Sequence, residues 1–152
     1  MTNKAILKGT YCILIHLKSN QAISIGKLGE IKFQKGYYAY VGSALNSLMP
    51  RIKRHLSPDK KLHWHIDYFL GHRDVEVVDV LYIVDDNKWE CELACNIADS
   101  ARIIENFGCS DCKCFSHLFY FKELDDLKEN CINSFEVKTL SPTSYFENER
   151  KN

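Results

Sequence analysis

The feature that most restricts the fold is the apolar run GTYCILIHL at Gly9–Leu17, which is long enough for a buried strand and far too short to cross a membrane. Further runs with strand character follow, bounded by glycines or by helical segments. They are AISIG, EIKF, GYYAYVG, VEVVDVLYIV and HLFYF. The chain therefore builds much of its core from a sheet.

Helical periodicity appears between these runs. Asn46 or Ser47 can cap a helix that carries an apolar stripe and ends at Ser57–Pro58. HWHIDYFLG forms a second helix, and Glu90–Glu105 a third with its own apolar face. After HLFYF, the last predicted strand, come a short acidic helix and a polar tail. This order predicts an α+β domain, with a short mixed or antiparallel sheet flanked by helices.

The charge distribution limits the classes of function. The 152 residues carry 20 Lys and Arg and 20 Asp and Glu, which excludes a protein that coats nucleic acid by bulk charge. The charge is balanced over the whole chain but uneven along it. Arg51–His65 has five Lys or Arg and three His against one Asp, whereas Glu123–Glu149 has seven acids against two lysines. We expect a main domain at 1–122 with a basic face, followed by an acidic helix and tail at 123–152.

Seven cysteines, an odd number, accompany an N-terminus that resembles no secretory signal. We therefore expect a cytoplasmic protein with no membrane association, whose thiols are reduced or bind metal. CSDCKCFSH clusters Cys109, Cys112, Cys114 and His117. A structural zinc site, with Cys91 or Cys95 as a substitute ligand, and inert buried thiols both remain open, while a redox pair is the weaker reading.

Three tyrosines crowd into four positions of KGYYAYVGSA, directly before a glycine. Strand alternation places Tyr40 and Gly42 on one face, and a neighbouring first strand would put Tyr11 there too. Arg51 and His55, four residues apart, share a face of the following helix. Any one tyrosine is explained by its strand propensity, but the set would bring two phenols, a guanidinium and an imidazole together.

The spacing of these residues resembles the GIY-YIG endonuclease superfamily: GTY at Gly9–Tyr11, YVG at Tyr40–Gly42, then Arg51 and His55. The first motif has threonine where the family name has isoleucine. GKLG, KGYYAYVGSA, KKLHWHIDYFL and ECELA resemble more closely the small prokaryotic Uri-type GIY-YIG family. The resemblance covers Gly9 to about Phe121.

The resemblance implies a divalent-metal-dependent endonuclease acting on DNA, in repair or structure-specific processing. It makes Tyr11 the general base, helped by Tyr40, His55 or a metal-bound water, because a phenol has a pKa near 10. Arg51 would clamp the phosphate through its planar fork. Glu90 would bind Mg²⁺ or Mn²⁺. Some Uri-type proteins are fused to a DNA-repair glycosylase, which suggests a repair-protein partner.

Contacts to DNA are expected beside the cleft and along the basic segment. Gly42 would let the backbone turn sharply next to the substrate, and lysines and arginines would hold phosphates without reading sequence. The candidates are Gly42, Ser43, Lys53, Arg54, Lys60 and Lys61. His63 and Asp67, also four residues apart, have metal-ligand spacing, but the aromatic residues around them favour a core helix in which either residue supports the site.

Two glutamates in WECELAC compete for the metal. Glu90 continues the apolar stripe of Leu93 and Ala94, whereas Glu92 continues a mostly polar face that begins with Cys95. A carboxylate on the sheet-facing stripe is costly to bury unless a cation pairs with it. Helix geometry therefore favours Glu90, and the first-turn dipole effect is the structural alternative.

A second hypothesis is a zinc-stabilised module that binds nucleic acid without cutting it, and a plain zinc-stapled scaffold is a third. RNA is not excluded as the substrate. The sequence does not define the oligomeric state.

Overall fold

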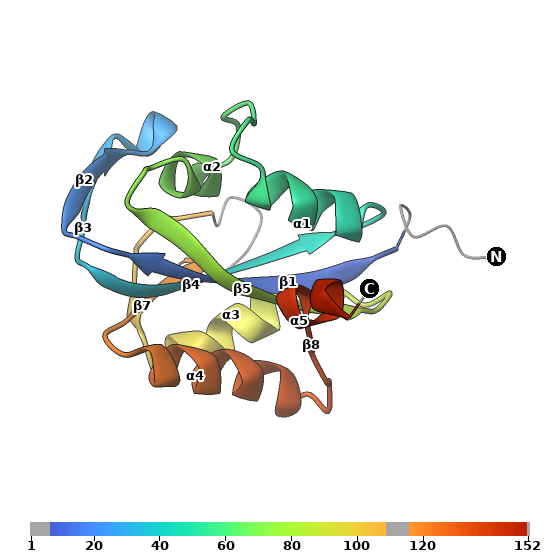
Figure 1. Cartoon of the computed structure of the whole chain (residues 1–152). Coiled ribbons are helices and arrows are strands. Elements are labelled where there is room, and N and C mark those ends of the chain that lie inside the picture. Colours follow the sequence, from blue (N-terminus) through green and yellow to red (C-terminus); the bar gives the residue numbers. More distant parts are fainter. Residues whose placement is uncertain (1–6, 109–115, 152) are drawn as a thin grey trace.

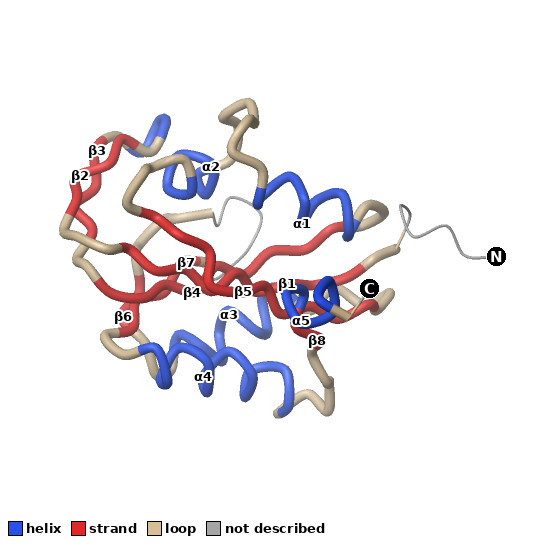
Figure 2. The backbone as a smooth tube through the Cα atoms, in the orientation of Figure 1, coloured by secondary structure: helices blue, strands red, loops and turns tan. Residues whose placement is uncertain are grey.

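The structure is a computed structural model that describes residues 7–108 and 116–151. It has an α+β fold, in which a six-stranded antiparallel sheet carries helices on both faces and a two-stranded hairpin at one end (Figures 1 and 2). The fold class expected from the order of the elements is confirmed. No helix in the two described ranges is both long and apolar enough to cross a membrane.

The main sheet has the strand order β6-β7-β4-β1-β5-β8. Its strands are β1 (Gly9–Leu17), β4 (Gly36–Ala44), β5 (Val75–Val84), β6 (Arg102–Ile103), β7 (Leu118–Phe121) and β8 (Thr143–Ser144). The hairpin pairs β2 (Gln21–Ser24) with β3 (Glu30–Phe33). Every run predicted to be extended is a strand, and β6 and β8 were not predicted.

Two helical layers enclose the sheet. α1 (Leu48–Leu56) and α2 (His65–Leu70) cover one face, and α3 (Glu90–Ala98) and α4 (Leu124–Glu136) cover the other (Figure 1). Two buried apolar clusters fill the spaces between the sheet and these layers. β1 is central, so Tyr11 and Ile13 enter one cluster while Cys12 and Leu14 enter the other. A strand covered on both faces needs apolar residues at successive positions, which explains the continuous run.

The predicted helix Glu90–Glu105 is wrong in its second half. α3 ends at Ala98, and Ile103 pairs with Phe119 of β7. Asp and Ser, which follow Ala98, compete with helical hydrogen bonds in helix interiors, and the sheet edge offers this segment backbone partners instead. Ile104 packs against the core cluster on the face of the sheet opposite α3.

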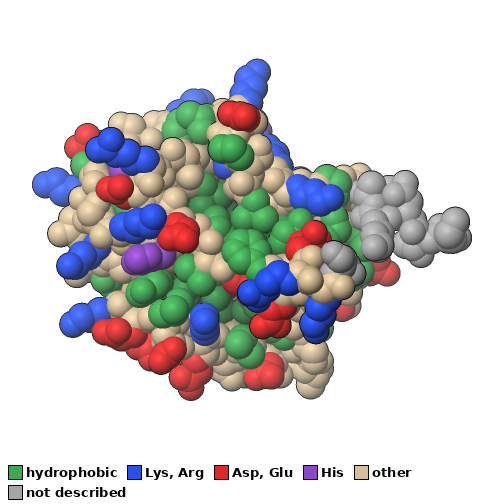
Figure 3. All heavy atoms as spheres, in the orientation of Figure 1, with side chains coloured by type: hydrophobic (Ala, Val, Ile, Leu, Met, Phe, Trp, Pro, Cys, Tyr) green, Lys and Arg blue, Asp and Glu red, His purple; other side chains and the backbone are tan. Residues whose placement is uncertain are grey.

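The polar tail predicted after the acidic helix is also wrong. β8 pairs with β5, and α5 (Tyr145–Arg150) packs against β5, with Tyr145 buried. The Ser144 hydroxyl donates a 2.6 Å hydrogen bond to Asp79 of β5. Figure 3 shows acidic side chains gathered along the lower edge of the face in view, over α4.

The end of β4 has an open edge that positions the site. β7 pairs with β4 only from Tyr37 to Tyr40, and the amide of Val41 then donates to the His117 carbonyl over 3.0 Å. From Gly42 to Ala44, β4 keeps β1 as its partner on one side. No strand of the described ranges pairs with it on the other side.

Candidate active site

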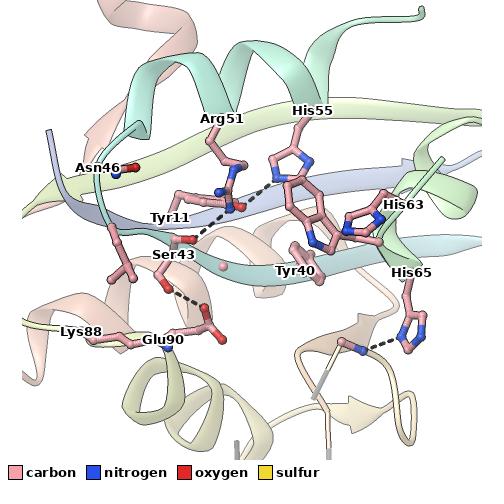
Figure 4. Close-up of a pocket in the computed structure, with 14 residues that line it drawn as sticks. Tyr11, Tyr40, Ser43, Asn46, Arg51, His55, His63, His65, Lys88 and Glu90 are labelled. Carbon is pink, nitrogen blue, oxygen red and sulfur yellow. Dashed lines mark hydrogen bonds between the residues drawn. The ribbon is translucent and has the colours of Figure 1, made fainter. Parts of the chain in front are cut away.

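A pocket of about 540 Å³ lies at this open edge, where β1 and β4 meet α1, the start of α2 and the start of α3 (Figure 4). All five residues predicted to be catalytic line it. The complete lining is Tyr11, Tyr40, Gly42, Ser43, Leu45, Asn46, Arg51, His55, His63, Trp64, His65, Lys88, Glu90 and Gly108.

Gly42 lies inside β4, opposite Tyr11 of β1. A Cβ at Gly42 would lie 2.6 Å from the Tyr11 phenol oxygen, far inside van der Waals contact. The backbone of Gly42 has no positive φ, so the expected sharp turn is wrong. The glycine is needed because the Tyr11 ring lies across the strand at this position.

Tyr11 and His55 form a buried pair. The Tyr11 Oη and His55 Nε2 are 2.7 Å apart, and both side chains are almost fully enclosed. Burial raises the pKa of Tyr11 well above its usual value, and the Arg51 guanidinium offsets part of that increase. Burial lowers the pKa of His55 to about 3. His55 is therefore neutral at physiological pH, and it is joined to the phenol by this hydrogen bond.

The second phenol, Tyr40, also lies close to His55. Its ring centroid is 6.3 Å from that of His55, in an edge-to-face arrangement. Burial raises the pKa of Tyr40 well above its usual value, and nearby Tyr11 and Glu90 add to the increase. Tyr40 therefore lines the pocket as a neutral hydroxyl.

Arg51 is held over the pocket from two directions. Its Nη1 donates to the Ser43 carbonyl oxygen over 3.2 Å, and its guanidinium lies 4.6 Å from the centroid of the Trp64 ring. Trp64 directly precedes α2, and the Arg54 guanidinium also lies over its ring, 4.4 Å from the ring centroid. Trp64 thus connects α2 to the two arginines of α1.

Glu90, the first residue of α3, reaches the pocket from the opposite helical layer. Its Oε1 accepts a 2.7 Å hydrogen bond from the Ser43 hydroxyl, and its Oε2 lies 3.0 Å from His117 Nδ1. Burial opposes ionisation of Glu90, but the hydrogen bonds from His117 and Ser43 outweigh it and keep the pKa of Glu90 below its usual value. Glu92 lies outside the pocket, 3.7 Å from Lys138.

In the basic segment Arg51–His65, some of the predicted DNA contacts bond within the protein and others are exposed to solvent. Arg54 forms two hydrogen bonds to Asp67, of 2.9 and 3.0 Å, and a third to the Lys61 carbonyl. Lys60 donates to two carbonyls at the end of α1. Lys53 and Lys61 are exposed, and none of the four side chains lines the pocket.

Asp67 is the internal partner of this segment. Its buried carboxylate holds Arg54 and also accepts the backbone amides of His63 and Trp64. Burial opposes its ionisation, but Arg54 and these amides outweigh that effect and lower the pKa of Asp67. The supporting role expected for this residue fits these contacts.

The predicted zinc ligands Cys109, Cys112 and Cys114 lie outside the described residues. His117 is described: it is buried, its Nδ1 faces Glu90, and its Nε2 has no hydrogen-bond partner within the described part of the chain. Cys91, one of the two substitute ligands, is disulfide-bonded, in contrast to the reduced or metal-bound thiol that was expected. The described ranges contain no group of three His, Cys, Asp or Glu side chains arranged to hold a metal. Zinc binding stays a prediction.

Sequence reasoning missed several residues of the pocket. Asn46, Lys88 and His65 line it and were not predicted, and the contacts to Glu90 of Ser43 and His117, which were predicted as a DNA contact and a zinc ligand, were not foreseen. Proximity in sequence gave a signal only for Lys88, two positions before Glu90. The other contacts depend on how distant segments meet.

The fold and the pocket define a small α+β domain with a tyrosine–histidine pair, an arginine and a glutamate in one cleft. Residues 10–140 match the family described as "Domain of unknown function DUF123", so the chain belongs to this family. No curated protein and no solved structure matches the chain.

Proposed function

We propose that the protein is a divalent-metal-dependent endonuclease that hydrolyses phosphodiester bonds in DNA. The observation that carries the proposal is the meeting of Tyr11, Arg51, His55 and Glu90 in one pocket at the open end of β4. These residues perform the roles that the resemblance to GIY-YIG endonucleases implies.

Tyr11 removes the proton from the attacking water. Its hydroxyl is 2.7 Å from His55 Nε2, so the neutral imidazole orients the phenol and, in its Nε2–H tautomer, donates a hydrogen bond to the phenolate that takes the proton of the water. The positive charge of Arg51 favours the same phenolate, because it offsets part of the rise in the pKa of Tyr11 caused by burial. Tyr40 lines the same pocket, close to His55.

Arg51 binds the phosphate that is cut. Its guanidinium is oriented by Trp64 and by the Ser43 carbonyl, which leaves it pre-positioned at the pocket. A fixed cation stabilises the charge that develops on the phosphate oxygens in the transition state. Lys88, exposed on the opposite rim, adds a second positive charge.

Glu90 is the residue that would hold Mg²⁺ or Mn²⁺. The carboxylate is ionised, lies at the pocket, and receives one hydrogen bond on each oxygen, which leaves further lone pairs available. Magnesium in phosphoryl-transfer sites is often held by one or two carboxylates together with waters and substrate phosphates, so this donor set fits it. The bound ion would neutralise charge on the phosphate and lower the pKa of a coordinated water.

The test is cleavage of supercoiled, linear and single-stranded DNA with Mg²⁺, Mn²⁺ or EDTA. Wild-type protein should cut in the presence of metal, and Tyr11→Phe should reduce the rate by about 10²–10³-fold. Tyr37→Phe is the matched control, because Tyr37 is on β4, the strand next to that of Tyr11, stacks on His16 and lies outside the pocket. It should cut at the wild-type rate.

Wild-type cleavage rates in Tyr11→Phe would refute the assigned base. Metal-independent DNA binding by a wild-type protein that cuts none of the substrates would favour the non-catalytic module. Cleavage of RNA in place of DNA would retain the chemistry and change the substrate.

A further inference from the structure

Glu90 and His117 form a contact that the proposed chemistry does not yet use. His117 Nδ1 is 3.0 Å from Glu90 Oε2, and the imidazole is 1 % exposed whereas the Glu90 side chain is 17 % exposed. A buried ring thus supports a carboxylate that reaches solvent in the pocket. The carboxylate oxygen can only accept, so Nδ1 carries the hydrogen of this contact.

The backbone around His117 is fixed. The His117 amide donates to the Phe107 carbonyl over 2.9 Å, and the His117 carbonyl accepts from Val41 of β4 over 3.0 Å. The preceding residue, Ser116, is also buried and bonds to the backbone of Leu118. The imidazole is therefore attached to the sheet next to the strand that carries Tyr40 and Ser43.

Ser43 completes the support from the other side. Its hydroxyl donates to Glu90 Oε1 over 2.7 Å while its carbonyl accepts from Arg51. One donor on each oxygen defines the plane of the carboxylate. Hydrogen bonds thus connect Arg51, Ser43, Glu90 and His117 in series at the pocket. Hydrogen bonds of this kind orient carboxylates that bind metals, and their loss typically weakens metal binding by 10–100-fold.

We propose that His117 is a positioning residue that orients the Glu90 carboxylate for a divalent cation. This inference rests on the proposed function, and it gives His117 a role in the cleavage pocket in addition to the zinc role predicted for it. It requires a hydrogen-bond donor at the position of Nδ1 and does not require the aromatic ring itself.

The experiment compares three variants of the full chain that differ in where a donor is placed. In His117→Asn the amide nitrogen takes the position of Nδ1, in His117→Gln it lies one atom further out, and in His117→Leu there is no donor. His16→Asn is the matched control, because His16 stacks on Tyr37 away from the pocket. Mn²⁺ affinity is measured by electron paramagnetic resonance without DNA, and thermal melting checks folding.

We expect His117→Leu and His117→Gln to weaken Mn²⁺ binding by about 10–100-fold, and His117→Asn to restore affinity to within a few-fold of wild type. The half-saturating Mg²⁺ concentration for cleavage should rise in parallel. If His117→Leu fails to fold, the comparison of Asn with Gln still decides the question. Wild-type affinity in a folded His117→Gln protein, or equal losses in the Asn and Gln variants, would overturn the proposal.

The two proposals fail in different ways. Cleavage with unchanged Mn²⁺ affinity in the Leu and Gln variants would overturn the role of His117 and leave the nuclease intact. The opposite outcome is a protein that cuts no nucleic acid but whose Mn²⁺ affinity depends on the position of the donor at residue 117. It would overturn the nuclease proposal and leave the role of His117 in cation binding.

Discussion

Tyr11 and Gly42 occupy paired positions of β1 and β4, and the phenol ring of Tyr11 fills the space that any side chain at position 42 would need. The pocket therefore depends on this one glycine for reasons of volume. Gly42 is buried and the Tyr11 side chain is 2 % exposed, so displacing the ring disturbs packed neighbours.

Gly42→Ala should displace the Tyr11 ring and lower the cleavage rate by about 10²-fold, since a shift of about 1 Å in a reacting group can cost that much. It should also lower the melting temperature through overpacking. In a Tyr11→Phe background, the same change should add little further loss of activity, because the hydroxyl is already absent. Full additivity of the two losses would contradict the explanation.

Cleavage should accelerate with pH if Tyr11 is the base. Its raised pKa leaves the phenol protonated at neutral pH, so the reactive ionised fraction grows about tenfold per pH unit. The logarithm of the single-turnover rate should rise with a slope near +1 from about pH 6.5 to about pH 8.5. His55, with a pKa of about 3, adds no bend in this window. A plateau above pH 7, or the same slope in Tyr11→Phe, would contradict the prediction.

Asp67 should matter for stability more than for catalysis. Asp67→Asn removes the buried negative charge that pairs with Arg54, and losing one member of a buried ion pair costs up to about 3 kcal/mol when the other is partly exposed. The pKa of Asp67 is lowered in the folded protein, so this stabilisation is present above the usual carboxyl pKa and is lost as the pH falls. Urea unfolding should show a large difference between wild type and variant at pH 7 that narrows below about pH 4. An Asp67→Asn protein as stable as wild type at pH 7 would refute the stabilising role of Asp67.

Lys88 and Lys53 form a matched pair for DNA binding, because both are exposed and only Lys88 lines the pocket. Lys88→Gln should weaken binding of uncleaved DNA in Ca²⁺ and reduce the salt dependence of the affinity by about one phosphate contact. Lys53→Gln should have the smaller effect if DNA enters through the pocket. A larger effect at Lys53 would place the duplex along the outer face of α1.

The sheet could be predicted because its signals are local. Gly9–Leu17 and Gly36–Ala44 each contain enough apolar and aromatic residues to define a strand, and helical periodicity alone separated Glu90, which lines the pocket, from Glu92, which does not. The break after Ala98 could not be predicted in the same way. The apolar stripe continues through that turn, and only pairing with β7 makes the next segment extended.

The contacts that support Glu90 could not be predicted from the sequence for a different reason. Ser43 and His117 reach Glu90 from segments that are distant in the chain, and a serine or a histidine is equally common in many other settings. The predicted DNA contact Arg54 shows the converse. Its position in a basic segment suggested an external role, whereas the fold gives its guanidinium the internal partner Asp67.

The two faces of the sheet contribute different halves of the pocket: Tyr11, Arg51 and His55 come from the α1 side, and Glu90 comes from α3 on the other. Neither helical layer alone brings an acid and a base together. A chain in which only one layer has docked therefore has no assembled cleft, however much secondary structure it contains. If the pocket cuts DNA as proposed, only a chain with both layers docked would be active, and nascent or partly opened molecules would not cut.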